Sequence, residues 1–345
     1  MSSNFHLIIG LESSCDETSA AILQDGKNIL SSFVSSQVEL HGKYGGIVPE
    51  LACRKHVEVI NPLIQESLEE AGISWNDIGG IAVTNGPGLV GALLIGVAAA
   101  KAISAVTGLP LLGVNHLEGH IYANFLEHDD IEFPFLCLVV SGGHSSLILV
   151  EGHGDYDILG ETRDDAAGEA FDKVARALNL GYPGGPVIDK MASDGNPQAV
   201  KFPRAYLEEG SLDFSFSGIK TAVINFLRSK EASKVTVNDI CASFQQAVVD
   251  VLVDKTLYAA QQYNVKAIAL AGGVASNSLL RSVLENEAGR NGFRFMRPSP
   301  ELCTDNASMI ACAGYYLFRE GHRSDLALDV FPSLPLIRRE FLKEF

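Results

Sequence analysis

The chain has 345 residues, which is enough for two lobes that each bury a core of their own. Apolar residues make up 47% and charged residues 20%, an ordinary composition for a soluble protein. The net charge of -16 argues against a protein that coats nucleic acid through its overall field. A local basic patch, or an RNA partner shared with other proteins, is still compatible with it.

We expect a cytoplasmic protein that does not enter a membrane. No basic segment precedes an apolar core near Met1, so no signal peptide is visible. The longest uncharged apolar stretch, Leu89–Ala100, is too short to span a bilayer, and two glycines interrupt it. The six cysteines form no Cys-x-x-Cys pair, and several lie in apolar runs. This pattern predicts buried free thiols in a reducing compartment.

Two segments read as hairpins of apolar strands joined by a small, polar turn. The first pairs strands over 5–11 and 20–23, and the second pairs strands over 134–140 and 146–150. Because each hairpin opens one half of the chain, they suggest two related lobes that face each other across a cleft. Two unrelated hairpins are the alternative.

Strand and helix signals alternate elsewhere in the chain. A strand over 81–84 leads into an Ala- and Gly-rich helix over 90–106, and a strand over 265–270 leads into a helix over 278–290. This alternation predicts an α/β fold with mainly buried sheets. We place the boundary between the halves near 130, in the acidic connection 128–132.

His116 and His120 follow a short buried strand over 111–114 and begin a helix. Side chains four residues apart on a helix share one face, so both imidazoles could reach one metal ion. In zinc peptidases of similar spacing, a glutamate directly follows the first histidine, but here Leu117 holds that position and Glu118 comes one residue later. The spacing alone leaves a metal site and two structural histidines both open.

Asp305 is the candidate for a third ligand. It precedes an apolar helix that runs through 309–311. An aspartate at a helix start also caps the helix by accepting backbone hydrogen bonds, so capping is the alternative role.

Glycine-bearing turns follow buried strands or lie beside helices, where backbone N–H groups can approach an anionic ligand closely. None matches a Walker motif or the spaced glycines of a dinucleotide fold. Together they favour a nucleotide held by backbone amides. The turns contain Gly86-Pro87-Gly88, Gly142-Gly143, Gly184-Gly185 and Gly272-Gly273.

Eight collinear motifs resemble the TsaD family, the bacterial threonylcarbamoyltransferases that modify tRNA. They cover nearly the whole chain, and one of them, Tyr44–Ala52, is typical of the bacterial and mitochondrial branch. The motifs are Gly10–Thr18, Tyr44–Ala52, Asn85–Leu89, His116–His120, Ser141–His144, Phe214–Thr221, Ala271–Asn277 and Cys303–Ala307.

The resemblance implies an actin-like, two-lobed fold of the sugar kinase and heat-shock ATPase type, with the active site in the cleft between the lobes. On this basis we expect an N-terminal lobe over 1–132, to which a helix around 304–325 returns. A C-terminal lobe would cover 133–303 and a tail would cover 326–345.

The family also implies the ligands. One divalent metal ion, Fe²⁺ or alternatively Zn²⁺, would be held by His116, His120 and Asp305. Glu12 and Asp16 are candidates to lie near phosphate, with solvated turn carboxylates as the alternative. The expected substrate-binding residues are Val139, Val140, Ser141, Gly142, Gly143, Asp172, Gly185, Asp189 and Asn277.

The implied reaction transfers a threonylcarbamoyl group from threonylcarbamoyl adenylate to N6 of adenosine 37 in tRNAs that read codons beginning with A. The product is t6A, and AMP is released. Because this substrate is already activated, no covalent nucleophile is expected. His144 is a candidate proton carrier or metal neighbour, with an oriented structural histidine as the alternative. The implied partners are tRNA, TsaB and TsaE, with TsaC or a relative making the adenylate.

Three other functions remain open from the residues alone. One is a metal-dependent glycoprotease, the activity once attributed to the family, although Leu117 replaces the general base it would need. Another is an actin-like ATPase that acts as a chaperone or kinase. The third is a non-catalytic scaffold of a tRNA-modifying complex.

Overall fold

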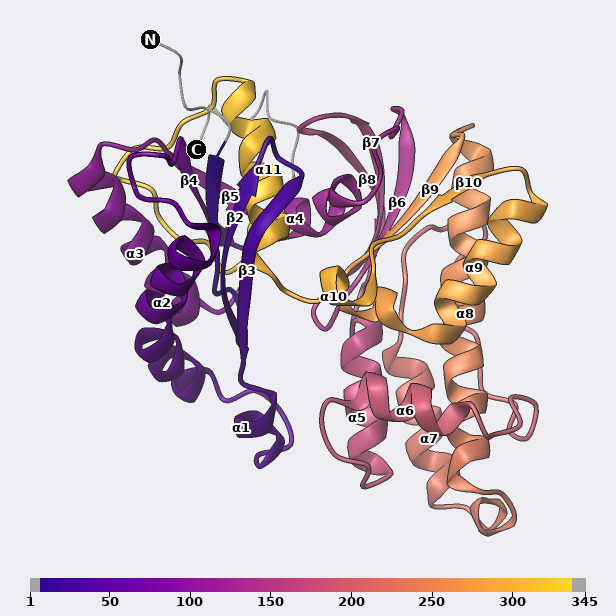
Figure 1. The fold of residues 1–345 in the computed structure, drawn as a ribbon. Coiled ribbons are helices and arrows are strands. Elements are labelled where there is room, and N and C mark those ends of the chain that lie inside the picture. The colour runs from indigo at the N-terminus through magenta and orange to yellow at the C-terminus, as the bar shows by residue number, and fades with distance from the viewer. Residues whose placement is uncertain (1–6, 337–345) are drawn as a thin grey trace. The chain divides into compact units, whose positions relative to one another are not determined.

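The computed structural model describes residues 7–336, so Phe5 and His6 of the first predicted strand lie outside it. The chain forms two compact units. The first runs to Ile131 and resumes at Thr304, and the second is Glu132–Cys303. Figure 1 follows the chain through both.

The first unit contains a five-stranded sheet in the order β3-β2-β1-β4-β5. Its first three strands form an antiparallel meander, whereas β4 and β5 continue the sheet in parallel with β1. The strands are β1 (Leu7–Glu12), β2 (Glu17–Gln24), β3 (Asn28–Ser36), β4 (Gly80–Gly86) and β5 (Leu111–Asn115).

Helices cover both faces of this sheet (Figure 1): α2 and α3 pack on one face, and α4 and α11 pack on the other. Ile9, Leu11 and Val83 alternate toward the α2–α3 face and join Val97 in the core. The helices are α1 (Val38–Gly42), α2 (Pro49–Ala71), α3 (Val90–Thr107), α4 (His116–Tyr122) and α11 (Ala307–Arg319), and a 3₁₀ turn covers Ala123–Leu126.

The second unit repeats the same sheet topology, in the order β10-β9-β6-β7-β8. Again an antiparallel meander is extended by two parallel strands. The strands are β6 (Phe135–Val140), β7 (Ser145–Gly152), β8 (Asp155–Glu161), β9 (Ala267–Ala271) and β10 (Arg294–Met296).

The helices of the second unit bury a large core together with its sheet. The 26-residue α8 is central to it, because α6, α7 and α9 all pack on this helix. The helices are α5 (Ala167–Ala177), α6 (Gly184–Ala192), α7 (Ser217–Leu227), α8 (Val237–Gln262), α9 (Ser278–Arg290) and α10 (Pro300–Cys303), with 3₁₀ turns at Lys230–Lys234 and Gly273–Ser276.

Both predicted hairpins are present, as β1–β2 and β6–β7. The shared strand order of the two sheets confirms the α/β prediction and supports two related halves. The outer strands β3, β8 and β10 were not predicted from the sequence. β3 has exposed apolar side chains such as Ile29 and Val34. The order of apolar and polar residues along this strand therefore does not mark a buried face.

The helix predicted over 90–106 is present as α3, and it is longer than the apolar stretch Leu89–Ala100 suggested. By length and composition α3 is the one helix among residues 7–336 that could cross a membrane, a test that core helices of soluble proteins also pass. Only 28% of it is buried in the structure. All six cysteines are free thiols, and four of them are buried, as predicted.

Gly10 allows α11 to lie directly against β1. A Cβ atom added at Gly10 would lie 2.3 Å from the carbonyl oxygen of Ala307 and 2.9 Å from the Ala311 Cβ. We therefore expect Gly10→Ala to lower the free energy of unfolding by about 1–3 kcal/mol, because overpacking forces backbone shifts. Chemical denaturation measures the change.

The control is Gly289→Ala on α9, where an added Cβ meets nothing within 4 Å. Removing a helical glycine there should raise the free energy of unfolding by up to about 1 kcal/mol. Equal effects of the two substitutions would contradict the close packing at Gly10.

Candidate metal centre and nucleotide-binding residues

Asn115, the last residue of β5, begins α4. Its side-chain oxygen accepts a hydrogen bond from the Leu117 backbone N–H at 2.9 Å, which caps the helix. His116 and His120 therefore lie one turn apart on the same face, with ring centroids 4.7 Å apart. The predicted pair at a strand-to-helix junction is confirmed.

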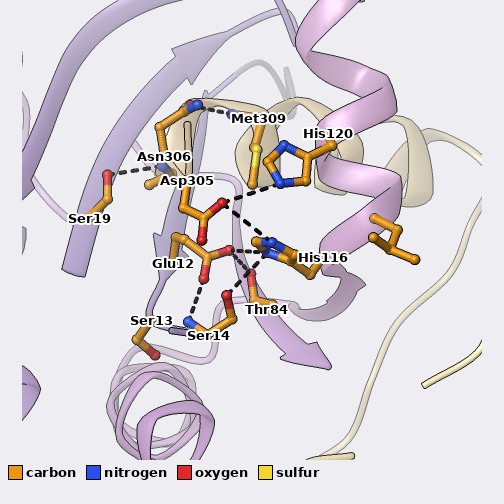
Figure 2. A network of polar contacts seen from close by, with 12 residues as sticks. Glu12, Ser13, Ser14, Ser19, Thr84, His116, His120, Asp305, Asn306 and Met309 are labelled. Atoms are coloured by element: carbon orange, nitrogen blue, oxygen red, sulfur yellow. Dashed lines mark hydrogen bonds and ion pairs between the residues drawn. The ribbon is translucent and has the colours of Figure 1, made fainter. Parts of the chain in front are cut away.

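Asp305 completes a group of three. Its Oδ1 lies 3.4 Å from His116 Nε2 and 3.2 Å from His120 Nε2 (Figure 2). The potential ligand atoms of the three residues all lie within 4.8 Å of one another. Among residues 7–336 this is the group that could hold a metal ion.

The capping role considered for Asp305 is wrong, because Asn306 caps α11. Its side-chain oxygen accepts from the Met309 backbone N–H at 3.0 Å. The next amide, that of Ala307, donates to Ser19 Oγ on β2 at 2.9 Å and fixes the helix start against the sheet. Asp305 is thus left to face the histidines, as Figure 2 shows.

Glu12 contacts the ring nitrogen of His116 that does not face Asp305. Its Oε2 lies 3.1 Å from His116 Nδ1 and accepts a hydrogen bond of 2.6 Å from the Thr84 hydroxyl, while Oε1 accepts from the Ser14 backbone N–H. A carboxylate on one ring nitrogen fixes the orientation of a metal-binding histidine and leaves the other nitrogen for the ion. Here Nε2 is the nitrogen that faces Asp305.

The two carboxylates and the histidine shift one another's pKa. Burial raises the pKa of Glu12 and of Asp305, but attraction to His116 outweighs it, so both pKa values lie below their usual range. Burial lowers the pKa of His116, but Asp305 and Glu12 outweigh it and hold that pKa well above 6.5. The site therefore favours a positive charge between the carboxylates.

His120 shows that the residues fit a metal ion. Its side chain is fully buried, and within the described chain neither of its ring nitrogens has a hydrogen-bond partner. Its 3.2 Å approach to Asp305 lacks hydrogen-bond geometry. A buried nitrogen without a partner costs free energy, which a coordinated cation would remove. Two imidazoles and a carboxylate suit iron or zinc and leave coordination positions open.

Glu12 and Asp16 are not solvated turn carboxylates, so that alternative is wrong. Both are buried, Glu12 at the end of β1 and Asp16 in the turn that follows. Glu12 acts on His116, and burial, Asp305 and Asp16 together raise the pKa of Glu17 to about 9. Their nearness to a phosphate stays a prediction.

The expected nucleotide ligands all lie in the second unit. Val139 and Val140 end β6, and the turn that follows is closed by a 2.8 Å hydrogen bond from the Ser141 N–H to the His144 carbonyl. A Cβ atom added at Gly142 or Gly143 would meet nothing within 4 Å. Both glycines are exposed, so there is room for a ligand beside this turn.

The other glycine pairs divide their roles. Gly184 and Gly272 are packed against backbone, since an added Cβ would lie 2.6 Å from the Phe171 carbonyl oxygen and 2.4 Å from that of Val140, respectively. Their neighbours Gly185 and Gly273 face open space. One glycine in each pair therefore serves packing, and the other leaves room beside the chain.

The polar residues expected to bind substrate are held by hydrogen bonds. Asp172 accepts from the Gly184 N–H at 2.7 Å, which fixes the start of α6. Asn277 caps α9 by accepting from the Leu280 N–H at 3.0 Å. Asp189 accepts from the side chain and the N–H of Ser278.

Sequence reasoning missed Thr84 and Ser14, which support the histidine, and Gln245, which contacts both Asp189 and Asn277. Thr84 and Gln245 lie far along the chain from the groups they hold, whereas Ser14 is two residues from Glu12 and acts through its backbone N–H, which no side-chain pattern marks. His144 lies at the β6–β7 turn of the second unit, and a role as proton carrier stays a prediction.

The two repeated sheets define a protein of the actin-like α/β class. The T. kodakarensis HypF structure matches 93% of this chain and 49% of its own, with a TM-score of 0.61 and 15% identity. Component A of the (R)-2-hydroxyglutaryl-CoA dehydratase of Acidaminococcus fermentans matches 91% of this chain and 98% of its own, with a TM-score of 0.54 and 17% identity. At these identities the likeness shows the fold alone.

Residues 28–312 match the TsaD model, described as tRNA N6-adenosine threonylcarbamoyltransferase, and the chain belongs to this family. Relatives with that description include one from Clostridium botulinum strain Hall, 54% identical over 96% of this chain and 98% of its own. Another, from Desulfitobacterium hafniense strain Y51, is 56% identical over 95% of this chain and 97% of its own. The resemblance drawn from the eight motifs is confirmed.

We expect His116→Ala to abolish metal binding while the protein stays folded, because the remaining ligands cannot enclose the ion. Glu12→Gln should keep the ligands but weaken binding by about 10–100-fold, since it removes only the supporting carboxylate. Metal content by elemental analysis and metal titration measures both effects. The control is His322→Ala, an exposed histidine outside the group.

Bound metal should also rise with pH. Because the pKa of His116 lies well above 6.5 without metal, the ion has to displace a proton, which is easier as pH increases. One metal ion per chain retained in the His116→Ala, His120→Ala double variant would place the site elsewhere.

Proposed function

We propose that this protein transfers the threonylcarbamoyl group from threonylcarbamoyl adenylate to N6 of adenosine 37 in tRNAs that read codons beginning with A, forming t6A and releasing AMP. The observation that carries the proposal is the His116, His120 and Asp305 group in a chain that matches TsaD relatives over nearly its full length. Transferase activity on tRNA is the activity named for that family.

The reaction needs no protein nucleophile. The N6 lone pair attacks the carbamoyl carbon, the bond from that carbon to the phosphate oxygen breaks, and the electron pair leaves with AMP. The amine then loses one proton. Since the mixed anhydride is already activated, the protein has to position the reactants and stabilise charge.

We assign the metal site one divalent ion, with Fe²⁺ favoured over Zn²⁺ because two histidines and one carboxylate with open positions are typical of non-haem iron. When bound, the ion would supply Lewis-acid polarisation and an anchor for substrate oxygens. Glu12 holds the ring of His116 in place for this purpose, with Thr84 and Ser14 orienting the carboxylate.

Residues of the second unit would bind the adenylate. The amides of Gly142 and Gly143 suit the phosphate because they have space around them and carry no side chain. Asp172 and Asp189 would accept hydrogen bonds from ribose hydroxyls, since carboxylates are acceptors only. Gly185 leaves room beside the start of α6.

The exposed apolar surface of α3 is the basis on which we propose partner proteins. Val90, Leu94 and Val106 are exposed, Val106 to 89%, and Lys101 is the one charged residue of this helix. An uncharged apolar helix face of this kind favours a covering protein. We propose TsaB and TsaE as partners and TsaC or a relative as the source of the adenylate, all in the cytoplasm.

A glycoprotease is the weaker alternative. Leu117, where a zinc peptidase has its general base, is buried among apolar residues and cannot activate water. A non-catalytic scaffold is also the weaker reading. It would not need the group formed by His116, His120 and Asp305.

Replacing Gly143 with Val should weaken binding of AMP, the stable leaving group, by at least about 10-fold, the equivalent of one lost hydrogen bond to a charged group. The fold should tolerate the change, because the site of the new side chain is open. Calorimetry and thermal unfolding measure the two effects. Gly289→Val, also open but on α9, is the matched control, and equal AMP binding by both variants would place the phosphate elsewhere.

The modified adenosine should form only when adenylate, tRNA and the partner proteins are combined. Binding of tRNA by the isolated chain should be weak and fall steeply with salt, because a chain of net charge -16 has few cations in register with phosphates. Nucleoside mass analysis detects the product. Cleavage of glycoproteins by the metal-loaded chain, with no t6A in the full mixture, would favour the protease instead.

A further inference from the structure

Gln245 joins two of the residues proposed to bind the adenylate. Its side-chain nitrogen donates a 3.0 Å hydrogen bond to Asp189 Oδ1 on α6. Its side-chain oxygen accepts a 2.9 Å hydrogen bond from the Asn277 amide nitrogen at the start of α9. Gln245 itself lies on α8, so one side chain links three helices of the second unit.

The direction of these hydrogen bonds follows from chemistry. The Leu280 N–H occupies the Asn277 oxygen, so the amide nitrogen of Asn277 has to face Gln245. Gln245 then presents its oxygen to Asn277 and its nitrogen to Asp189, which as a carboxylate can only accept. Each hydrogen bond in the series from Leu280 to Asp189 thereby sets the orientation of the amide group that makes the next one.

The surroundings of Gln245 make these bonds important. The side chain is only 3% exposed, and its neighbours on α8, Cys241, Phe244 and Val249, belong to the apolar core. A buried amide is costly unless both of its ends are bonded. Here both ends are used on residues proposed to bind substrate.

The chain of bonds leaves groups available to a ligand. The Asn277 amide has two hydrogens and gives one to Gln245, so the other can be donated. Asp189 accepts from Gln245 and Ser278 and keeps lone pairs for further donors. Asp189 and Gln245 also line a cavity of about 450 Å³ together with Gln246 and Ser278.

We propose that Gln245 is a positioning residue for the nucleoside part of the adenylate. It holds Asp189 as an acceptor and Asn277 as a donor at a fixed separation. This inference rests on the proposed function, because it takes Asp189 and Asn277 as ligands of that substrate. The metal ligands His116, His120 and Asp305 belong to the other unit.

The test compares Gln245→Met with Gln261→Met in the reconstituted tRNA reaction. Methionine keeps the volume of glutamine but cannot bond Asp189 or Asn277. Gln261 is the matched control: it also lies on α8, but it is exposed, does not line the cavity, and its amide donates to Asn291. AMP binding by calorimetry, metal content and thermal unfolding are measured beside the kinetics.

Gln245→Met should raise the KM for adenylate and the Kd for AMP at least 10-fold, with kcat within 3-fold of the parent and metal content unchanged. Gln261→Met should leave KM and Kd within 2-fold. If Gln245→Met does not fold, Gln245→Glu replaces it, since it keeps the acceptor for Asn277 and removes the donor to Asp189, and the same increases are expected.

A folded Gln245 variant with unchanged KM and Kd, or equal losses in the Gln261 control, would overturn the positioning role. A fall in kcat alone would also overturn it. If the parent protein makes no modified nucleoside, the proposed function fails, and the AMP titrations still decide whether Gln245 orders a nucleotide site.

Discussion

The placement of His116 between the carboxylates of Glu12 and Asp305 is the constraint on which the metal centre depends. Glu12 faces one ring nitrogen and Asp305 faces the other, and within residues 7–336 neither carboxylate forms an ion pair with an arginine or lysine. Removing two such charges from water is costly unless a cation lies between them. A proton on His116 supplies part of this positive charge. A metal ion that also binds His120 would supply more of it.

The fold of the first unit supplies this geometry through backbone packing. Gly10 lets α11 approach β1, and Ser19 fixes the start of that helix, so that Asp305 reaches α4 across more than 180 residues of intervening chain. Asn115 caps α4, which carries the two histidines, and Asn306 caps α11, directly after Asp305. Both helices therefore begin at positions set by asparagines, and the ligands themselves are spared from capping.

The second unit has the same strand order but carries different chemistry. In the first unit Glu12 ends the first strand and Asp16 lies in the turn after it, whereas the equivalent β6–β7 turn holds Gly142 and Gly143. A turn with carboxylates supports a cation site, and a turn with free backbone amides suits an anion. Gln245 adds a hydrogen-bonded chain that links α6, α8 and the start of α9. One topology thus supports two kinds of ligand.

The sequence by itself determined what depends on local spacing: both hairpins, the helices over 90–106 and 278–290, the shared face of His116 and His120, and, through collinear motifs, the family. It could not separate ligand from cap at Asp305, because either role fits a helix start, and only the position of Asn306 decided it. The tertiary structure alone showed that Glu12 supports His116 and that Gln245 joins Asp189 to Asn277. Those contacts join residues 104, 56 and 32 positions apart, and no periodicity in the sequence encodes which distant side chains the packing of helices on sheets brings within hydrogen-bond distance.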